Sequence, residues 1–266
     1  MSFTPFARRL LTVAANEPLG AYRLLRVNDA GGPEPQAGQF AMLAAAQRWG
    51  GGDDERPYLP RAFSIARRRE DESHFLLEDV GPGTRRLCEL SAGEELWSLG
   101  PLGRGFAPPR DGRRAILVGG GAGIAPLAIL QDSLSQQASV LVGFRDADRV
   151  PGAGLLRDAA IATDDGSAGY HGRVTELLSE ELANDPHAEV YACGPAAMLE
   201  GVRAMCARAD VPGQLALEAP MACGFGACYG CAVERRGGGY LRVCVDGPVL
   251  EAGELAAVDA YAGAPA

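Results

Sequence analysis

AILVGGGAGIAP, residues 115–126, decides how the middle of this 266-residue chain folds. Ala115–Val118 is a short apolar run typical of a buried strand, a glycine-rich turn follows it, and Pro126 opens a helical stretch to about Leu134. A glycine turn between a strand and a helix lets backbone N–H groups approach a diphosphate. Ile124 occupies the position of the third glycine of G-x-G-x-x-G, so the turn departs from this motif. Taken alone, it is therefore also consistent with an ordinary tight turn that binds no ligand.

The alternation of strands and helices continues to about residue 209. Strands are expected at Val140–Gly143, Ile161–Thr163 and Val190–Ala192, and helices at Val174–Glu181 and Ala196–Ala209. This alternation is typical of a parallel sheet with helices on both faces, which binds ligands at the carboxyl ends of its strands. Cys193-Gly194-Pro195 follows one of these strands, so we expect it to share a site with the glycine turn.

The region before residue 108 has a different pattern, with short or alternating apolar runs separated by Gly, Pro and Asp. This spacing predicts an antiparallel barrel or sandwich. The polar, glycine-rich segment 48–60 is expected to be an exposed hairpin loop, and Arg67-Arg68-Arg69 a solvated turn. The predicted strands are Tyr22–Val27, Gln39–Ala44, Arg61–Ala66, His74–Leu77 and Glu95–Leu99.

The composition limits the class of protein. With 47 % apolar and 22 % charged residues the chain is globular, and its net charge of -9 disfavours nucleic acid and anionic lipid as partners. The sequence contains no lysine, so an anion site must use arginine or backbone N–H groups. No apolar stretch approaches the roughly 20 residues of a membrane helix, and the N-terminus lacks the apolar core of a signal peptide. We therefore expect a cytoplasmic protein with no membrane partner.

Four of the seven cysteines crowd into residues 223–244. Cys223, Cys228 and Cys231 have the spacing C-x4-C-x2-C, and Cys244 follows after twelve residues. This is the plant-type [2Fe–2S] spacing, and glycines between the thiolates allow the backbone to turn its N–H groups toward the sulfurs. A structural zinc site is the alternative, but it usually has two C-x2-C pairs. Cys88 and Cys206 are expected to be buried small apolar residues.

The run Arg61-Ala62-Phe63-Ser64 is a candidate flavin strand, together with Gly81-Pro82-Gly83-Thr84 at the end of another strand. An arginine pairs with a diphosphate, an aromatic ring packs on a flat ring, and a hydroxyl hydrogen-bonds a ring nitrogen. A motif of only four residues occurs often by chance, so this run supports a flavin site only together with the other motifs.

Taken together, these motifs resemble those of the electron-transfer subunits of heteromeric, NAD-dependent dihydroorotate dehydrogenases, a family in the ferredoxin reductase superfamily. The resemblance runs in order from end to end, and also includes Gly100-Pro101-Leu102-Gly103, Met221-Ala222 and Val243–Pro248. It implies an FAD-binding antiparallel β-barrel at 1–108, a Rossmann-like α/β NAD domain at 109–212, and a small [2Fe–2S] domain at 213–266. One departure is Phe63, since many members of the superfamily have tyrosine there.

The resemblance also implies roles for individual residues. Ser64 and Cys193 are expected to lie at the hydride-transfer face, and Cys223, Cys228, Cys231 and Cys244 to bind iron. The expected FAD residues are Arg61, Ala62, Phe63, Ser64, Leu76, Leu77, Glu78, Gly83 and Thr84. The expected nicotinamide nucleotide residues are Gly119, Gly120, Gly121, Gly123, Pro126, Cys193, Gly194, Pro195 and Met198.

Acidic residues favour NAD(H) over NADP(H). Thr163-Asp164-Asp165-Gly166-Ser167 follows a strand of the nucleotide domain, and carboxylates there repel a 2′-phosphate and accept from ribose hydroxyls. Asp164 is the leading candidate for the ribose contact, and Asp146 is the alternative. It is equally open that Asp164 and Asp165 are acidic turn residues without a ligand role.

These sites predict a path for electrons from nicotinamide through FAD to the cluster. The resemblance implies that the path continues to an FMN in a separate dihydroorotate dehydrogenase catalytic subunit, in a heterotetramer. One alternative is a reductase subunit of a sulfur-metabolising, ferredoxin-linked or hydrogenase complex. The other is a non-enzymatic binding module with structural zinc.

Overall fold

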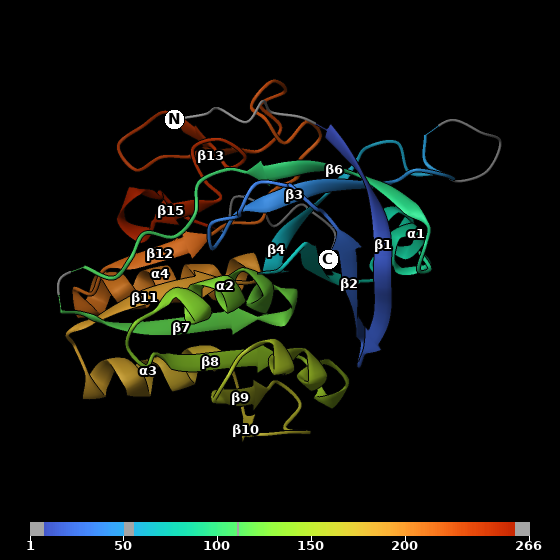
Figure 1. Ribbon diagram of the computed structural model, residues 1–266. Coiled ribbons are helices and arrows are strands. Elements are labelled where there is room, and N and C mark those ends of the chain that lie inside the picture. The colour runs from blue at the N-terminus through green and yellow to red at the C-terminus, as the bar shows by residue number, and fades with distance from the viewer. Residues whose placement is uncertain (1–7, 51–55, 111, 259–266) are drawn as a thin grey trace.

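The computed structural model describes residues 8–50, 56–110 and 112–258, and its chain forms a barrel, an α/β layer and a C-terminal segment that contacts both (Figure 1). The predicted antiparallel barrel is confirmed: its described strands close in the order β1-β2-β5-β4-β3-β6. Alternate residues of each strand, such as Leu43 on β3 and Ile65 on β4, fill its interior. The strands are β1 (Arg8–Leu19), β2 (Tyr22–Asn28), β3 (Phe40–Ala45), β4 (Arg61–Arg69), β5 (Glu72–Glu78) and β6 (Glu95–Leu102).

The α/β layer has the predicted helices on both faces of a sheet ordered β10-β9-β8-β7-β11-β12-β15. Ile116 and Val118 on β7 pack with α3 and α4, whereas Leu117 between them packs with α2 on the opposite face. The elements are β7 (Arg114–Gly120), η1 (Gly121–Ile124), α2 (Ala125–Ser133), β8 (Ser139–Phe144), η2 (Ala147–Leu155), β9 (Ala159–Thr163), β10 (Tyr170–His171), α3 (Val174–Asn184), β11 (Ala188–Cys193) and α4 (Ala196–Ala209).

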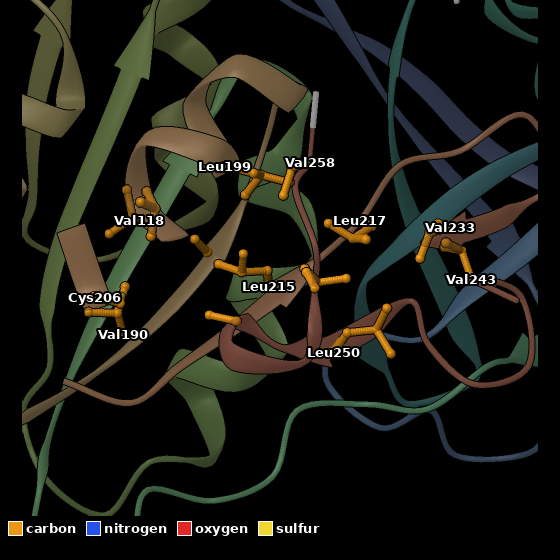
Figure 2. Close-up of a cluster of buried hydrophobic side chains, with 14 of the residues drawn as sticks. Val118, Val190, Leu199, Cys206, Leu215, Leu217, Val233, Val243, Leu250 and Val258 are labelled. Atoms are coloured by element: carbon orange, nitrogen blue, oxygen red, sulfur yellow. The ribbon is translucent and has the colours of Figure 1, made fainter. Parts of the chain in front are cut away.

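The C-terminal segment continues the sheet. The sequence past residue 212 shows no long apolar run, yet β12 (Gly213–Ala216) pairs in parallel with β11, and β15 (Val249–Glu251) pairs antiparallel with β12. Between them lies the two-stranded hairpin of β13 (Ala232–Glu234) and β14 (Tyr240–Arg242), and η3 (Ala252–Glu254) follows β15. In Figure 2, Leu215, Leu217 and Leu250 lie between the sheet residues and Val233 and Val243 of the cysteine-rich segment. The position of a domain boundary near residue 212 stays a prediction.

Three local features differ from the sequence-based expectation or extend it. Gly81-Pro82-Gly83-Thr84 is not only a turn, because Pro82 begins the short helix α1 (Pro82–Cys88). Arg68 is not solvated, since its guanidinium pairs with the buried Asp29 carboxylate at 3.1 Å inside the barrel end. The loop 48–60 connects the antiparallel pair β3 and β4, as expected of a hairpin, although residues 51–55 lie outside the described residues.

Ion pairs join the barrel to the α/β layer at two places. Asp132 on α2 pairs with Arg67 on β4 at 3.1 Å, and Arg149 on η2 pairs with Glu78 on β5 at 2.9 Å. Because α2 also packs against β4, the carboxyl edge of the sheet is held close to the outer face of the barrel. None of the described helices has the length and apolar character needed to cross a membrane.

Candidate functional site

The candidate flavin strand β4 presents alternate residues to opposite sides of the barrel wall. Phe63 and Ile65 pack into the barrel interior, so Ala62 and Ser64 lie on the outer face, toward the α/β layer. The aromatic ring of Phe63 therefore stabilises the barrel. The small side chains of Ala62 and Ser64, both partly or fully exposed, leave room on the outer face for a planar ligand.

Arg61 lies directly against Gly83 at the start of α1. A Cβ on Gly83 would lie 2.6 Å from Nε of Arg61, so only glycine leaves this space to the guanidinium. Thr84 fixes the same turn, since its hydroxyl accepts from the Val80 N–H at 2.9 Å and donates to the Gly81 carbonyl at 3.0 Å. Because a guanidinium is the group best suited to forked contacts with a diphosphate, the residues present fit the phosphates of FAD.

The other predicted FAD residues, on β5, have mixed environments. Leu76 packs with the core under α2, and Leu77 is buried in the barrel interior. The Glu78 carboxylate accepts hydrogen bonds from Nε and Nη2 of Arg149 at 3.1 and 2.9 Å. The side chains of Leu76 and Glu78 therefore build the junction of barrel and sheet, and that of Leu77 fills the barrel, which leaves the backbone of β5 as their available contact with a flavin.

The structure brings the glycine turn and the segment after β11 into direct contact. A Cβ on Gly120 would lie 2.6 Å from Sδ of Met198, and one on Gly123 would lie 2.5 Å from the Cys193 carbonyl. These two glycines are required for packing. Gly121 differs, because it has a positive φ of 55° and no heavy atom closer than 3.8 Å to the position of a Cβ, so its backbone is open to a ligand.

The remaining residues predicted for the nicotinamide nucleotide surround this contact. Gly119 packs on Ile124, and Gly194 packs on Gly120 and Met198. Pro195 is the residue before α4, and Pro126 is buried in the first turn of α2. The turn and the two helix starts thus converge at the carboxyl edge of the sheet, where a dinucleotide is bound in folds of this kind.

Glu218 is a site residue that the sequence reasoning missed. It follows β12 by two residues at the same edge, and the residue is exposed to solvent. Desolvation by neighbouring protein atoms, despite the exposure of the residue, and the negative charge of Glu78 raise the pKa of Glu218, and burial together with Glu218 raises the pKa of the Cys193 thiol. An acidic residue directly after an apolar run at a ligand-binding edge was the signal that could have identified it.

The acidic residues after β8 and β9 have different environments. Ser167 donates to Oδ1 of Asp165 from both its backbone N–H and its hydroxyl, so Asp165 stabilises its own turn. Asp146 pairs with Arg149. Asp164 is exposed, and among the described residues no side-chain partner is found for its carboxylate. Asp164 is therefore the carboxylate available to a ribose.

The four cysteines of the C-terminal segment come together as two pairs of thiols. Sγ of Cys231 lies 3.1 Å from Sγ of Cys244, and both residues are buried. Cys223 forms a hydrogen bond with the exposed Cys228. Within the described residues no His, Cys, Asp or Glu group is already arranged as a metal site. The donor set is nevertheless that of a thiolate-bound iron–sulfur cluster.

Backbone N–H groups point at these sulfurs, as predicted. Burial raises the pKa of Cys223, but the N–H groups of Phe225, Ala227 and Cys228 outweigh it and bring the pKa to about 6. Burial and the adjacent Cys231 raise the pKa of Cys244 to about 12, against one N–H from Gly226. A loop that offers several N–H donors to sulfur stabilises the negative charge that a cluster gains on reduction.

Known proteins match this chain over most of its length. Residues 218–256 match the family of the iron–sulfur cluster binding domain of dihydroorotate dehydrogenase B. The dihydroorotate dehydrogenase B (NAD(+)) electron transfer subunit of Caldanaerobacter subterraneus subsp. tengcongensis is 37 % identical over 229 residues, 84 % of this chain and 88 % of the relative. The subunit with the same name from Desulforamulus reducens is 37 % identical over 211 residues, 75 % of this chain and 80 % of the relative.

Solved structures with lower sequence identity share the fold. A chain of the NADH-dependent reduced ferredoxin-NADP oxidoreductase superposes with a TM-score of 0.77 at 22 % identity, covering 92 % of this chain and 89 % of its own length. The ferredoxin reductase of carbazole 1,9a-dioxygenase gives a TM-score of 0.67 at 22 % identity, with 79 % of this chain and 67 % of that chain covered.

Proposed function

Because this chain belongs to the family of dihydroorotate dehydrogenase B electron transfer subunits, we propose that it carries electrons between NAD(H) and the FMN of a dihydroorotate dehydrogenase catalytic subunit. Its own cofactors are FAD and one [2Fe–2S] cluster, and it is an oxidoreductase subunit. The observation that carries the proposal is that four thiols, supplied with backbone N–H donors, lie in a segment packed on the barrel strand beside β4.

Residues of the chain bring the cofactors together. Arg61 and the turn of Gly83 and Thr84 hold the phosphates of FAD, and the outer face at Ala62 and Ser64 receives its ring. The turn at Gly121 and the segment from Cys193 to Met198 hold the nicotinamide nucleotide against that ring. Bound FAD would supply the exchange between a two-electron hydride and single electrons, and a cluster held by the four cysteines would supply a one-electron carrier. No acid–base pair is needed for these transfers, and Ser64 and Cys193 orient the reacting rings.

The proposed partner is an FMN-containing catalytic subunit, with two copies of each subunit in a heterotetramer. The names of the relatives support a catalytic partner, since each is described as an electron transfer subunit. The cluster loop also fits a docking role, because Cys228 is exposed and Tyr229 beside it is 62 % exposed. We place the protein in the cytoplasm, where its seven unpaired thiols stay reduced.

The proposal is tested on the purified chain with an ultraviolet–visible spectrum, iron, sulfide and flavin analysis, and an anaerobic titration with NADH. We expect both the flavin and the cluster bands to bleach. The chain is then mixed with the catalytic subunit and dihydroorotate, and NAD⁺ reduction should require both proteins. A colourless zinc protein, or bands that do not respond to NADH, would contradict the proposal, and NADH-driven bleaching without coupling to dihydroorotate would point to a reductase subunit of another complex.

A further inference from the structure

Met42 connects the candidate flavin strand to the loop that carries the cysteines. Its side chain is 2 % exposed and packs in the apolar cluster that also contains Cys231 and Cys244. A Cβ on Gly224 would lie 2.5 Å from Cγ and 2.9 Å from Sδ of Met42, so the methionine packs directly on the Gly224 backbone. Gly224 has a positive φ of 79° and follows Cys223. Both its conformation and this contact therefore exclude a larger residue.

The strand register places Met42 beside the flavin strand. Met42 on β3 is paired with Ala62 on β4 in the antiparallel ladder. Side chains of paired residues project from the same face, and the strands are about 4.8 Å apart. The flanking residues Ala41 and Leu43 lie in the barrel interior, which confirms that Met42 and Ala62 lie on the outer face.

Met42 links the flavin strand to the cysteine loop on this face. Ala62 contributes only a methyl group to this face and Gly224 only backbone, and Met42 both packs on Gly224 and pairs with Ala62 in the strand ladder. Leu102 is the next neighbour of Gly224, with Cδ1 at 3.2 Å from the position of a Cβ. An unbranched, polarisable side chain is well suited to fill an irregular gap of this kind.

We propose that Met42 is a positioning residue for electron transfer, because it holds Gly224 and the adjacent Cys223 at a fixed separation from the flavin strand. This inference rests on the proposed function. In each transfer one electron leaves the reduced flavin and one enters the oxidised cluster, and no bond to Met42 forms or breaks. Since the rate of such a transfer falls steeply with distance, a shorter side chain that lets the loop shift changes the rate of this step and leaves hydride transfer from NADH unaffected.

The experiment compares the holoprotein with Met42→Ala and Met42→Leu. Anaerobic stopped-flow mixing with NADH follows the flavin and cluster bands separately. In Met42→Ala we expect flavin reduction at the wild-type rate and slower cluster reduction. Met42→Leu, which conserves the volume, should restore the wild-type rate. A second measurement does not depend on turnover: the electron paramagnetic resonance spectrum of the chemically reduced cluster should change in Met42→Ala and stay unchanged in Met42→Leu.

Leu25→Ala is the matched control, because Leu25 is fully buried in the barrel interior away from the cysteine segment. It creates a comparable cavity and should reduce thermal stability without changing either the spectrum or the rate of cluster reduction. Loss of the cluster from Met42→Ala alone, with iron retained in Leu25→Ala, also supports the positioning role.

Three results would overturn the inference. The first is wild-type cluster reduction in Met42→Ala with full iron content, the second is equal slowing in Leu25→Ala, and the third is failure of Met42→Leu to restore the rate. If NADH bleaches neither band in the wild-type protein, the proposed function itself is wrong. These outcomes are distinguishable because the wild-type titration is performed first.

Discussion

Glu218 lies close enough to Cys193, at the carboxyl edge of the sheet, for its negative charge to act on the Cys193 thiol. Cys193 is paired with Ala216 in the register of β11 and β12, and Glu218 lies two residues further along the chain. Its charge contributes to the raised pKa of Cys193, and its own pKa is raised by desolvation and by Glu78. A carboxyl group with a raised pKa therefore lies at the sheet edge where the nicotinamide is expected.

Glu218 should make the stability of the protein depend on pH. A carboxyl whose pKa is raised in the folded state binds its proton more tightly there than in the unfolded chain, so its stabilising effect is complete below about pH 4 and is lost as the pH rises through the folded pKa. Glu218→Gln should therefore unfold at a higher temperature than the wild type at pH 8, and the gain should shrink toward pH 5. Thermal unfolding of both holoproteins across this range measures the effect, and a gain independent of pH would contradict it.

Gly83→Val should weaken the binding of FAD. The new Cβ would lie 2.6 Å from Nε of Arg61 and would displace the guanidinium from the turn. Loss of about 1.4 kcal/mol of binding free energy corresponds to a tenfold lower affinity, and we expect a loss of about this size or larger. Flavin fluorescence titration of the FAD-free protein measures it. Gly81→Ala is the control, since nothing lies within 4 Å of its Cβ position, and equal losses in both variants would show that the Arg61 contact is unimportant.

Cys228→Ser should lose the iron and keep the flavin. Cys228 is one of the four proposed thiolate ligands, and an iron–sulfur cluster is held by thiolates. Iron and sulfide content should fall to a small fraction of the wild-type values, while flavin content and reduction by NADH persist. Cys88→Ser serves as the control, because Cys88 lies on the barrel helix α1 and burial raises its pKa to about 11. Retention of a full cluster in Cys228→Ser would remove this residue from the ligand set.

Asp164→Ser should relax the preference for NADH over NADPH. Its carboxylate is exposed at the end of β9, where it would repel a 2′-phosphate. Removing this like-charge contact should raise the NADPH to NADH ratio of kcat/KM roughly tenfold or more. Asp165→Ser should instead disturb its turn and affect both nucleotides alike, because Asp165 already accepts from Ser167. A shift in the NADPH to NADH ratio for Asp165→Ser, with none for Asp164→Ser, would contradict this prediction and show that Asp165 sets the selectivity.

Local patterns in the sequence predicted the barrel and the parallel sheet, because the strands and helices that were recognised carry their own periodicity. The strand around Val118 and the helix 196–209 are examples, and the helix has the predicted bounds. The short strands β12 and β15 were missed, since four and three residues show no periodicity and their pairing joins segments far apart in the chain. Strand β1 was missed for another reason: Asn16, Glu17 and Pro18 interrupt any alternation of apolar residues.

The candidate site was predicted unevenly for the same reason. Motifs of adjacent residues, such as the glycine turn and the cysteine run, were found because their chemistry is local. Glu218 and Met42 are single residues, and their importance depends on which strands lie beside them. Register and tertiary packing decide that, and neither is present in a local pattern.

The placement of the cysteine segment between β12 and β15 affects how this protein can be divided. These strands are neighbours in the sheet, so both ends of the segment return to the same edge. A chain shortened at residue 212 would lose both strands and leave β11, whose six residues are all buried, as an open edge. Unpaired apolar edges promote aggregation, so such a truncation would be a poor route to a smaller flavoprotein. An engineer who wishes to transplant this metal-binding loop must move the edge of the sheet together with it.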